Sequence, residues 1–101
     1  SSAVIRDRVI KAREWQKERF RNTRCTYNSD MNGEDVEKYC VLGAAEKKLM
    51  ETAYKKMQFS ARSYHRVLKV ARTIADLDGK EEIRIPHLSE ALSYRMTERK
   101  V

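Results

Sequence analysis

The sequence contains little glycine, proline or cysteine, with three, one and two of these residues among 101. So few helix-breaking residues, together with 37% charged and 41% apolar residues, favour amphipathic helices over strands or a disordered chain. No apolar run approaches the roughly 18 residues of a membrane span, and Ser1 to Arg8 carry charge where a signal peptide is apolar. We therefore expect a soluble, cytoplasmic, all-α domain without a membrane partner.

The sequence also lacks the common metal and catalytic motifs. Cys25 and Cys40 form no CxxC pair, which predicts free thiols, and with His65 and His87 they lack the close spacing of a zinc site. A phosphate-binding G-x-x-x-x-G-K-[ST] loop is missing, because the single Gly-Lys pair, at 79–80, is followed by Glu and lacks the earlier glycine. We therefore predict no metal site, no catalytic residues and no enzyme activity for this chain alone.

The apolar pattern predicts a small bundle of four to five helices in a single domain, residues 1–101. The first helix is capped by Ser2, and polar residues then indicate a loop over 22–33. A short helix capped by Asn32 ends near 41–43, and a third runs from Ala44 to Met57. The inward stripe of the first helix is Ile5, Val9, Ala12, Gln16 and Phe20, and that of the third is Ala45, Leu49, Ala53 and Met57, widened by Met50 and Tyr54.

The fourth helix has the strongest pattern and is the expected centre of the core. It is predicted over Ala61 to Leu77, with Ser60 as its N-cap and Gly79 closing it. Pro86 suits the first turn of a last helix, after a short extended connector over 81–85. The inward residues are Tyr64, Val67, Leu68, Ala71, Ile74 and Ala75 in the fourth helix, and Leu88, Ala91, Leu92 and Met96 in the last.

Basic residues exceed acidic ones, 22 to 15, which favours association with polyanions such as nucleic acid or nucleotide phosphates. Arg62, Arg66 and Lys69 fall on one stripe of the fourth helix, opposite its apolar face. A charged stripe of this kind is more often a solvated helix face than a binding surface.

Two segments resemble a known family. Residues 60–77 (SARSYHRVLKVARTIADL) are similar to the signature helix of magnesium-chelatase-like AAA+ ATPases of the ComM/YifB type, and residues 83–95 (IRIPHLSEALSYR) to the closing helix of that family. Residues 5–16 (IRDRVIKAREWQ) resemble more loosely the helix that follows the ATPase core, and residues 28–31 its loop. The stretch 21–27 departs from the short glycine-containing linker of the family.

The resemblance implies that the chain is the C-terminal helical lid of a larger AAA+ protein, and the absence of a Met at the start fits an excised piece. The lid closes over ATP with magnesium, held by an upstream P-loop domain of the same chain in a hexamer, and no cofactor is expected for the lid alone. Arg62 matches the sensor-2 arginine, whose guanidinium contacts the γ-phosphate. Arg66, Lys69 and Arg72 receive no assignment from the family and form an interface, a DNA contact or a solvated face.

Three functions remain open from the sequence. The ComM-like branch implies DNA branch migration in transformation or recombination. The sequence of residues 68–77 resembles this branch more than the magnesium-chelatase branch. The magnesium-chelatase branch implies metal insertion into a porphyrin. A free-standing basic domain would instead place one helix in the DNA major groove, with Arg62, Ser63 and His65 near its start.

Overall fold

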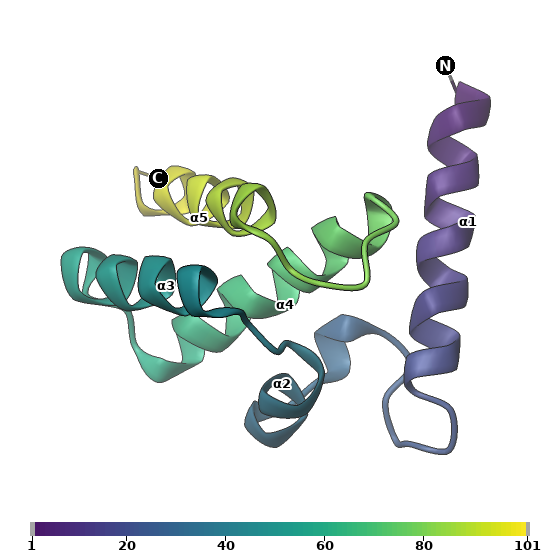
Figure 1. Cartoon of the computed structure of the whole chain (residues 1–101), viewed down its shortest axis with the longest axis horizontal. Helices are drawn as coiled ribbons and strands as arrows, with labels where there is room; N and C mark the ends of the chain where they lie inside the picture. The colour runs from purple at the N-terminus through teal and green to yellow at the C-terminus, as the bar shows by residue number, and fades with distance from the viewer. Residues whose placement is uncertain (1, 101) are drawn as a thin grey trace.

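The structure, a computed structural model, describes residues 2–100, with side chains described as far as residue 94. Over this range the chain forms five α-helices and a short 3₁₀ helix (Figure 1). None of these helices has the length and apolarity needed to cross a membrane. The helices are α1 (Ser2–Arg19), η1 (Asn28–Asp30), α2 (Gly33–Tyr39), α3 (Ala44–Met57), α4 (Ala61–Leu77) and α5 (Ile85–Lys100).

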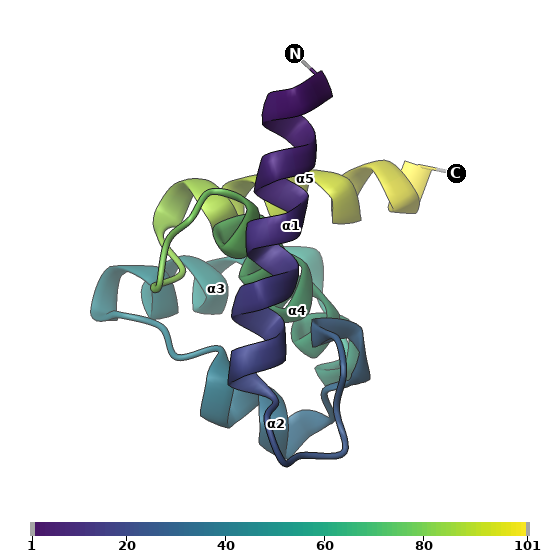
Figure 2. The same ribbon diagram turned by 90° about the vertical axis from the view of Figure 1, so that its right-hand side faces the viewer.

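Helix α4 is the centre of the fold, as its strong pattern predicts. It contacts α1, η1, α2 and α5, and α5 in turn packs on α3. Figures 1 and 2 show α4 crossing between α1 on one side and α3 with α5 on the other. The fully buried side chains Met31, Met50, Ile83 and Leu88 bring these elements into one core. The all-α class and the single bundle are therefore confirmed for the described residues.

The helix boundaries follow local hydrogen bonds that the sequence predicts. Asn32 and Asp35 form a reciprocal capping box at the start of α2, with side chain-to-backbone distances of 2.9 and 3.0 Å. Ser60 Oγ accepts from the backbone N–H of Ser63 at 3.1 Å and caps α4. Because each cap satisfies amides that have no partner within the helix, these positions fix where α2 and α4 begin.

Helix α4 ends at a left-handed glycine. Gly79 has φ +71°, its N–H donates to the carbonyl of Asp76, and the N–H of Lys80 donates to the carbonyl of Ala75. This is a Schellman motif, in which a side chain at the glycine would be strained. The chain then runs extended, and an isolated parallel bridge joins Ile83 to Leu42, so that the predicted connector holds the α2–α3 loop.

The structure corrects the expected inward faces of α1 and α3. In α1, Ala12, Gln16 and Phe20 are buried as predicted, but Ile5 is 63% exposed and Val9 is only half-buried. The first turns of α1 extend beyond the other helices (Figures 1 and 2). The apolar period there marks one side of the helix, but no described element covers that side. In α3, the buried residues are Glu46, Met50 and Ala53, whereas Ala45 and Tyr54 are exposed. The side chain of Met96 lies outside the described residues.

The two cysteines are free and buried. Burial raises the pKa of the Cys40 thiol from its ordinary value of 9.0 to about 11, because a thiolate would lose its hydration in the core. The folded protein therefore binds this proton more tightly than the unfolded chain, and the corresponding stability is present below pH 9 and is lost as pH rises toward 11.

We predict that Cys40→Ala flattens the alkaline loss of stability. Between pH 9 and pH 11 the wild type should lose about 2–3 kcal/mol more than the variant, from a shift of two pKa units at 1.36 kcal/mol each. Urea unfolding at several pH values measures this, and each protein serves as its own reference at pH 8. Parallel pH profiles for the two proteins would contradict the buried-thiol assignment.

Candidate functional site

A basic cleft lies along the exposed side of α4. It has a volume of about 460 Å³ and lies between residues 62–74 of α4 and the 3₁₀ helix η1. Arg62, Arg66 and Lys69 supply its cations, and Ser29 of η1 contributes to the opposite wall. Its lining is completed by Val70, Thr73 and Ile74, which belong to the same helix. The structure thus brings together three of the four basic residues that the sequence singled out.

Arg62 is positioned by the N-cap of α4. The Ser60 cap makes Ala61 the first helical residue, so Arg62 lies in the first turn with its side chain exposed. The first turn of α4 contains no acidic residue, and the positive end of the helix dipole therefore acts on Arg62 without compensation. Arg66 follows one turn later, where two like charges at an i,i+4 spacing repel each other. An anion bound in the cleft would offset both the unfavourable helix dipole at Arg62 and the repulsion between Arg62 and Arg66.

The three cations differ in how far they are already engaged. Lys69 is half-buried, and its Nζ donates to the carbonyl of Ser29 at 3.4 Å. Within the described side chains, neither Arg62 nor Arg66 has an ion pair with a carboxylate. Both arginines are therefore available to a ligand, whereas Lys69 partly serves to hold η1 against α4.

Arg72 does not belong to this cleft, which corrects its expected place on an interface or solvated face. Its side chain is only 4% exposed, and its Nη1 and Nη2 donate to the carbonyls of Glu81 and Lys80, each at 2.8 Å. Burial lowers the pKa of the Arg72 guanidinium, and the neighbouring carboxylate of Asp76 opposes that effect. Arg72 is thus a structural residue that fastens the end of α4 to the connector before α5.

Asp76 is the acceptor of a buried polar cluster that sequence reasoning missed. Its carboxylate accepts from Arg19 at 2.7 and 2.9 Å and from Asn28 at 2.9 Å, and its Oδ1 lies 3.2 Å from Arg72 Nη2. Asn28 also donates to Thr73 Oγ1, and its backbone N–H donates to Gln16. The side chain of Arg19 is only 11% exposed. An acidic residue one position beyond the inward-facing Ala75 was the available signal.

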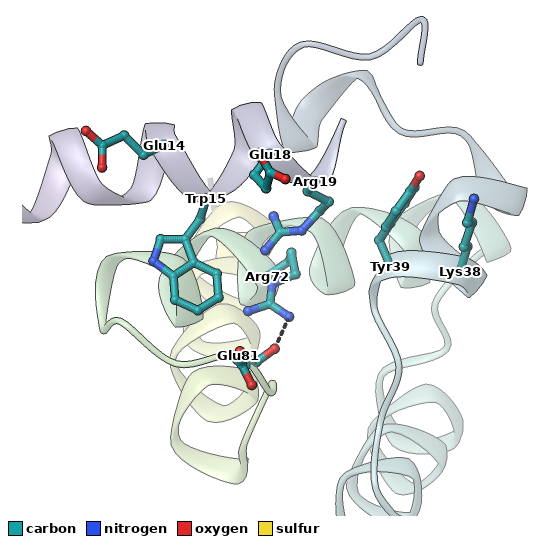
Figure 3. A pocket seen from close by; sticks show the side chains of 8 residues that line it. All are labelled: Glu14, Trp15, Glu18, Arg19, Lys38, Tyr39, Arg72 and Glu81. Carbon is teal, nitrogen blue, oxygen red and sulfur yellow. Dashed lines mark hydrogen bonds between the residues drawn. The ribbon is translucent and has the colours of Figure 1, made fainter. Parts of the chain in front are cut away.

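A second cleft opens above this cluster, with a volume of about 590 Å³. Figure 3 shows Trp15 and Tyr39 on its two sides, with the guanidinium groups of Arg19 and Arg72 between them. Asp76 and the two backbone carbonyls already occupy most of their donors. This cleft is therefore lined by groups that hold the fold, whereas the α4 cleft presents two arginines that the described carboxylates leave unpaired.

The chemistry of the α4 cleft follows from its two exposed arginines. Within residues 2–94 there is no cluster of three His, Cys, Asp or Glu side chains that could hold a metal ion. Two exposed guanidinium groups in a cleft can bind an anion but cannot by themselves supply a nucleophile or a general base. Fold and site together define a small helical domain with a basic surface cleft.

Comparison with known proteins assigns the family. Residues 1–95 match the family model described as magnesium chelatase, subunit ChlI C-terminal, and the chain belongs to this family. It is 44% identical over 95 residues to the competence protein ComM of Haemophilus influenzae and 39% identical over 99 residues to the uncharacterized protein YifB of Salmonella typhimurium. These alignments cover 94% and 98% of the chain but only 18% and 19% of the relatives, so the chain spans under a fifth of their length.

We predict that Asp76→Asn destabilises the fold by about 3–5 kcal/mol, because it leaves two buried guanidinium groups without their shared charge. Chemical denaturation with equal protein concentrations measures the change. Asp7→Asn is the matched control, because the side chains of the Asp7–Lys11 ion pair are each about two-thirds exposed. This substitution should leave the unfolding midpoint nearly unchanged. Equal midpoints for both variants would show that the buried cluster contributes no stability.

Proposed function

We propose that this chain is the C-terminal helical lid of a magnesium-chelatase-like AAA+ ATPase, and that Arg62 is its sensor-2 arginine. The observation that carries the proposal is the exposed guanidinium of Arg62 in the first turn of α4, without an ion pair to any described carboxylate. The upstream P-loop domain of the same parent chain supplies the ATP, its magnesium ion and the catalytic groups. The lid alone hydrolyses nothing.

The residues of the cleft fit a phosphate group. A guanidinium binds phosphate oxygens through two parallel N–H donors, and the start of a helix favours an anion. In the parent protein Arg62 contacts the γ-phosphate, and Arg66, one turn further along α4, adds positive charge at the same surface. Because the cap and the core fix α4, loss of the γ-phosphate on hydrolysis releases the lid as a rigid body, which couples the nucleotide state to movement.

The names of the relatives favour the ComM/YifB type over magnesium chelatase as the parent protein whose activity the lid movement drives. The chain has 44% identity to a protein named for competence. We accordingly propose that the parent protein is a cytoplasmic hexamer that remodels DNA, with branch migration as the specific activity. The description of the matching family supports a second activity for a parent protein with the same lid. In that alternative, the parent protein is a magnesium chelatase that inserts metal into a porphyrin.

We predict that Arg62→Ala in the full-length protein reduces ATP turnover by at least about tenfold, since one charge-assisted contact is worth about 1.5–3 kcal/mol. Arg62→Lys should recover only part of the activity, because an ammonium keeps the charge but lacks the bidentate geometry. Lys56→Ala, another exposed cation, is the control and should leave turnover unchanged. Thermal unfolding verifies that all variants are folded, and wild-type turnover in Arg62→Ala would remove the sensor assignment.

A second candidate function has one specific observation in its favour. The sequence lacks a clear helix-turn-helix signature, yet α3 and α4 are joined by only three residues, and Gln58 in this turn adopts a left-handed conformation with φ +50°. Such a turn is typical of helix-turn-helix units, in which the second helix enters the major groove. Arg62 and Arg66 would then lie near the start of a recognition helix.

Duplex binding by the isolated domain distinguishes the two candidates. If α4 is a recognition helix, binding should weaken steeply with salt, and Arg62→Ala and Arg66→Ala should each reduce the slope of log affinity against log salt by about one. If the domain is a lid, the isolated domain should bind duplex weakly, and Lys56→Ala should change that weak binding as much as Arg66→Ala. Fluorescence anisotropy between 50 and 200 mM salt measures both slopes.

A further inference from the structure

The first half of α1 carries apolar residues that the domain does not use. Ile5 and Ile10 are 63% and 48% exposed, whereas Ala12 and Gln16 further along the same helix are buried. Ile5, Val9, Ala12 and Gln16 follow one another at spacings of four, three and four residues. They therefore lie on one stripe of the helix. The stripe is therefore buried where α1 packs against α4 and open where α1 extends beyond it (Figure 2).

Local interactions give this half of the helix little support. Its first turn contains no acidic residue to complement the helix dipole, and Val9 and Ile10 are β-branched residues of modest helix propensity. The i,i+4 pair of Asp7 and Lys11, at 3.2 Å, is exposed and weak. Short helices are marginally stable in water without tertiary packing, so the exposed stripe indicates that these turns pack on another surface.

We propose that the stripe formed by Ile5 and Val9 docks onto the part of the parent protein that precedes this domain. This inference rests on the proposed function, in which the chain is the lid of a longer ATPase. The matching family model is described as a C-terminal part, and the relatives are more than five times as long as the chain. A C-terminal part has the rest of its protein on its N-terminal side, where α1 begins, and the covalent linkage raises the effective concentration of that part at this stripe.

The charges of α1 disfavour a second copy of the chain as the occupant. The helix carries six basic and three acidic residues, so two copies packed stripe to stripe would bring like charges together. By helical spacing, Arg6 and Arg8 flank the stripe on its two sides. The complementary surface on the preceding domain should therefore have an apolar centre and an acidic rim.

This docking surface is separate from the Arg62 cleft. Arg8 lines a pocket with Asp78 and Pro86, which places this half of α1 beside the C-terminal end of α4. Arg62 lies in the first turn of the same helix. The 17 residues of α4 therefore separate the two surfaces, and a substitution at one should leave the other intact.

Hydrogen–deuterium exchange in the full-length protein without nucleotide tests the proposal. Amides 6–11 report on docking, because the first four N–H groups of a helix lack partners within it. Ile5→Gln should accelerate their exchange by about tenfold, since it removes an apolar contact with the preceding domain. Val41→Gln is the matched control, because Val41 is 67% exposed in the α2–α3 loop, and it should leave these amides unchanged. Circular dichroism verifies the fold of both variants.

Two results would overturn the inference. Equal exchange of amides 6–11 in wild type and Ile5→Gln would show that nothing packs on the stripe. If the protection of amides 6–11 is lost when dilution dissociates the protein into monomers, the stripe packs against a neighbouring copy instead. The outcome is distinguishable from that of the sensor assignment: protected amides with wild-type turnover in Arg62→Ala would keep the docking surface and remove only the role of Arg62.

Discussion

The fold depends on the buried carboxylate of Asp76. It accepts hydrogen bonds from Arg19 in α1 and Asn28 in η1, and it pairs with Arg72 one turn earlier in α4. Charges removed from water are costly unless most of their hydrogen-bonding groups are matched. The Nη1 and Nη2 atoms of Arg72 also donate to carbonyls of the α4–α5 connector, whereas its buried Nε has no partner among the described residues. Four segments distant in sequence are thereby held in one relative position, which apolar packing alone would fix less specifically.

The shape of the basic cleft follows from the same cluster. Asn28 donates to Asp76 and also to Thr73, which is one of the cleft residues. This pair of bonds holds η1 on α4 and places Ser29 opposite the cations, where its carbonyl accepts from Lys69. The wall of the candidate site is therefore built by a buried polar cluster, and the exposed arginines are presented on a surface that the core keeps rigid.

The sequence predicted the elements well, because each depends on local chemistry. The bounds of α3 and α4, the caps at Asn32 and Ser60 and the closing Gly79 all follow from apolar period and from hydrogen bonds within a few residues. Periodicity states which side of a helix is apolar but not whether a neighbour covers it, which is why Ile5 was placed in the core. It also cannot pair charges 57 residues apart, so the burial of Arg19 against Asp76 could not be predicted.

Two features of the domain are locally unfavourable, and they lie at opposite ends of α4. Arg62 and Arg66 place like charges at the positive end of a helix, and the first turns of α1 expose the apolar side chain of Ile5. Elsewhere the caps, the glycine and the buried cluster agree with one another, as expected of a sequence selected for one fold. Such departures concentrate where function rather than stability determines the residue. Both surfaces are therefore where the proposed contacts would offset a local cost: a phosphate would offset the charge repulsion at Arg62 and Arg66, and an apolar surface would cover Ile5.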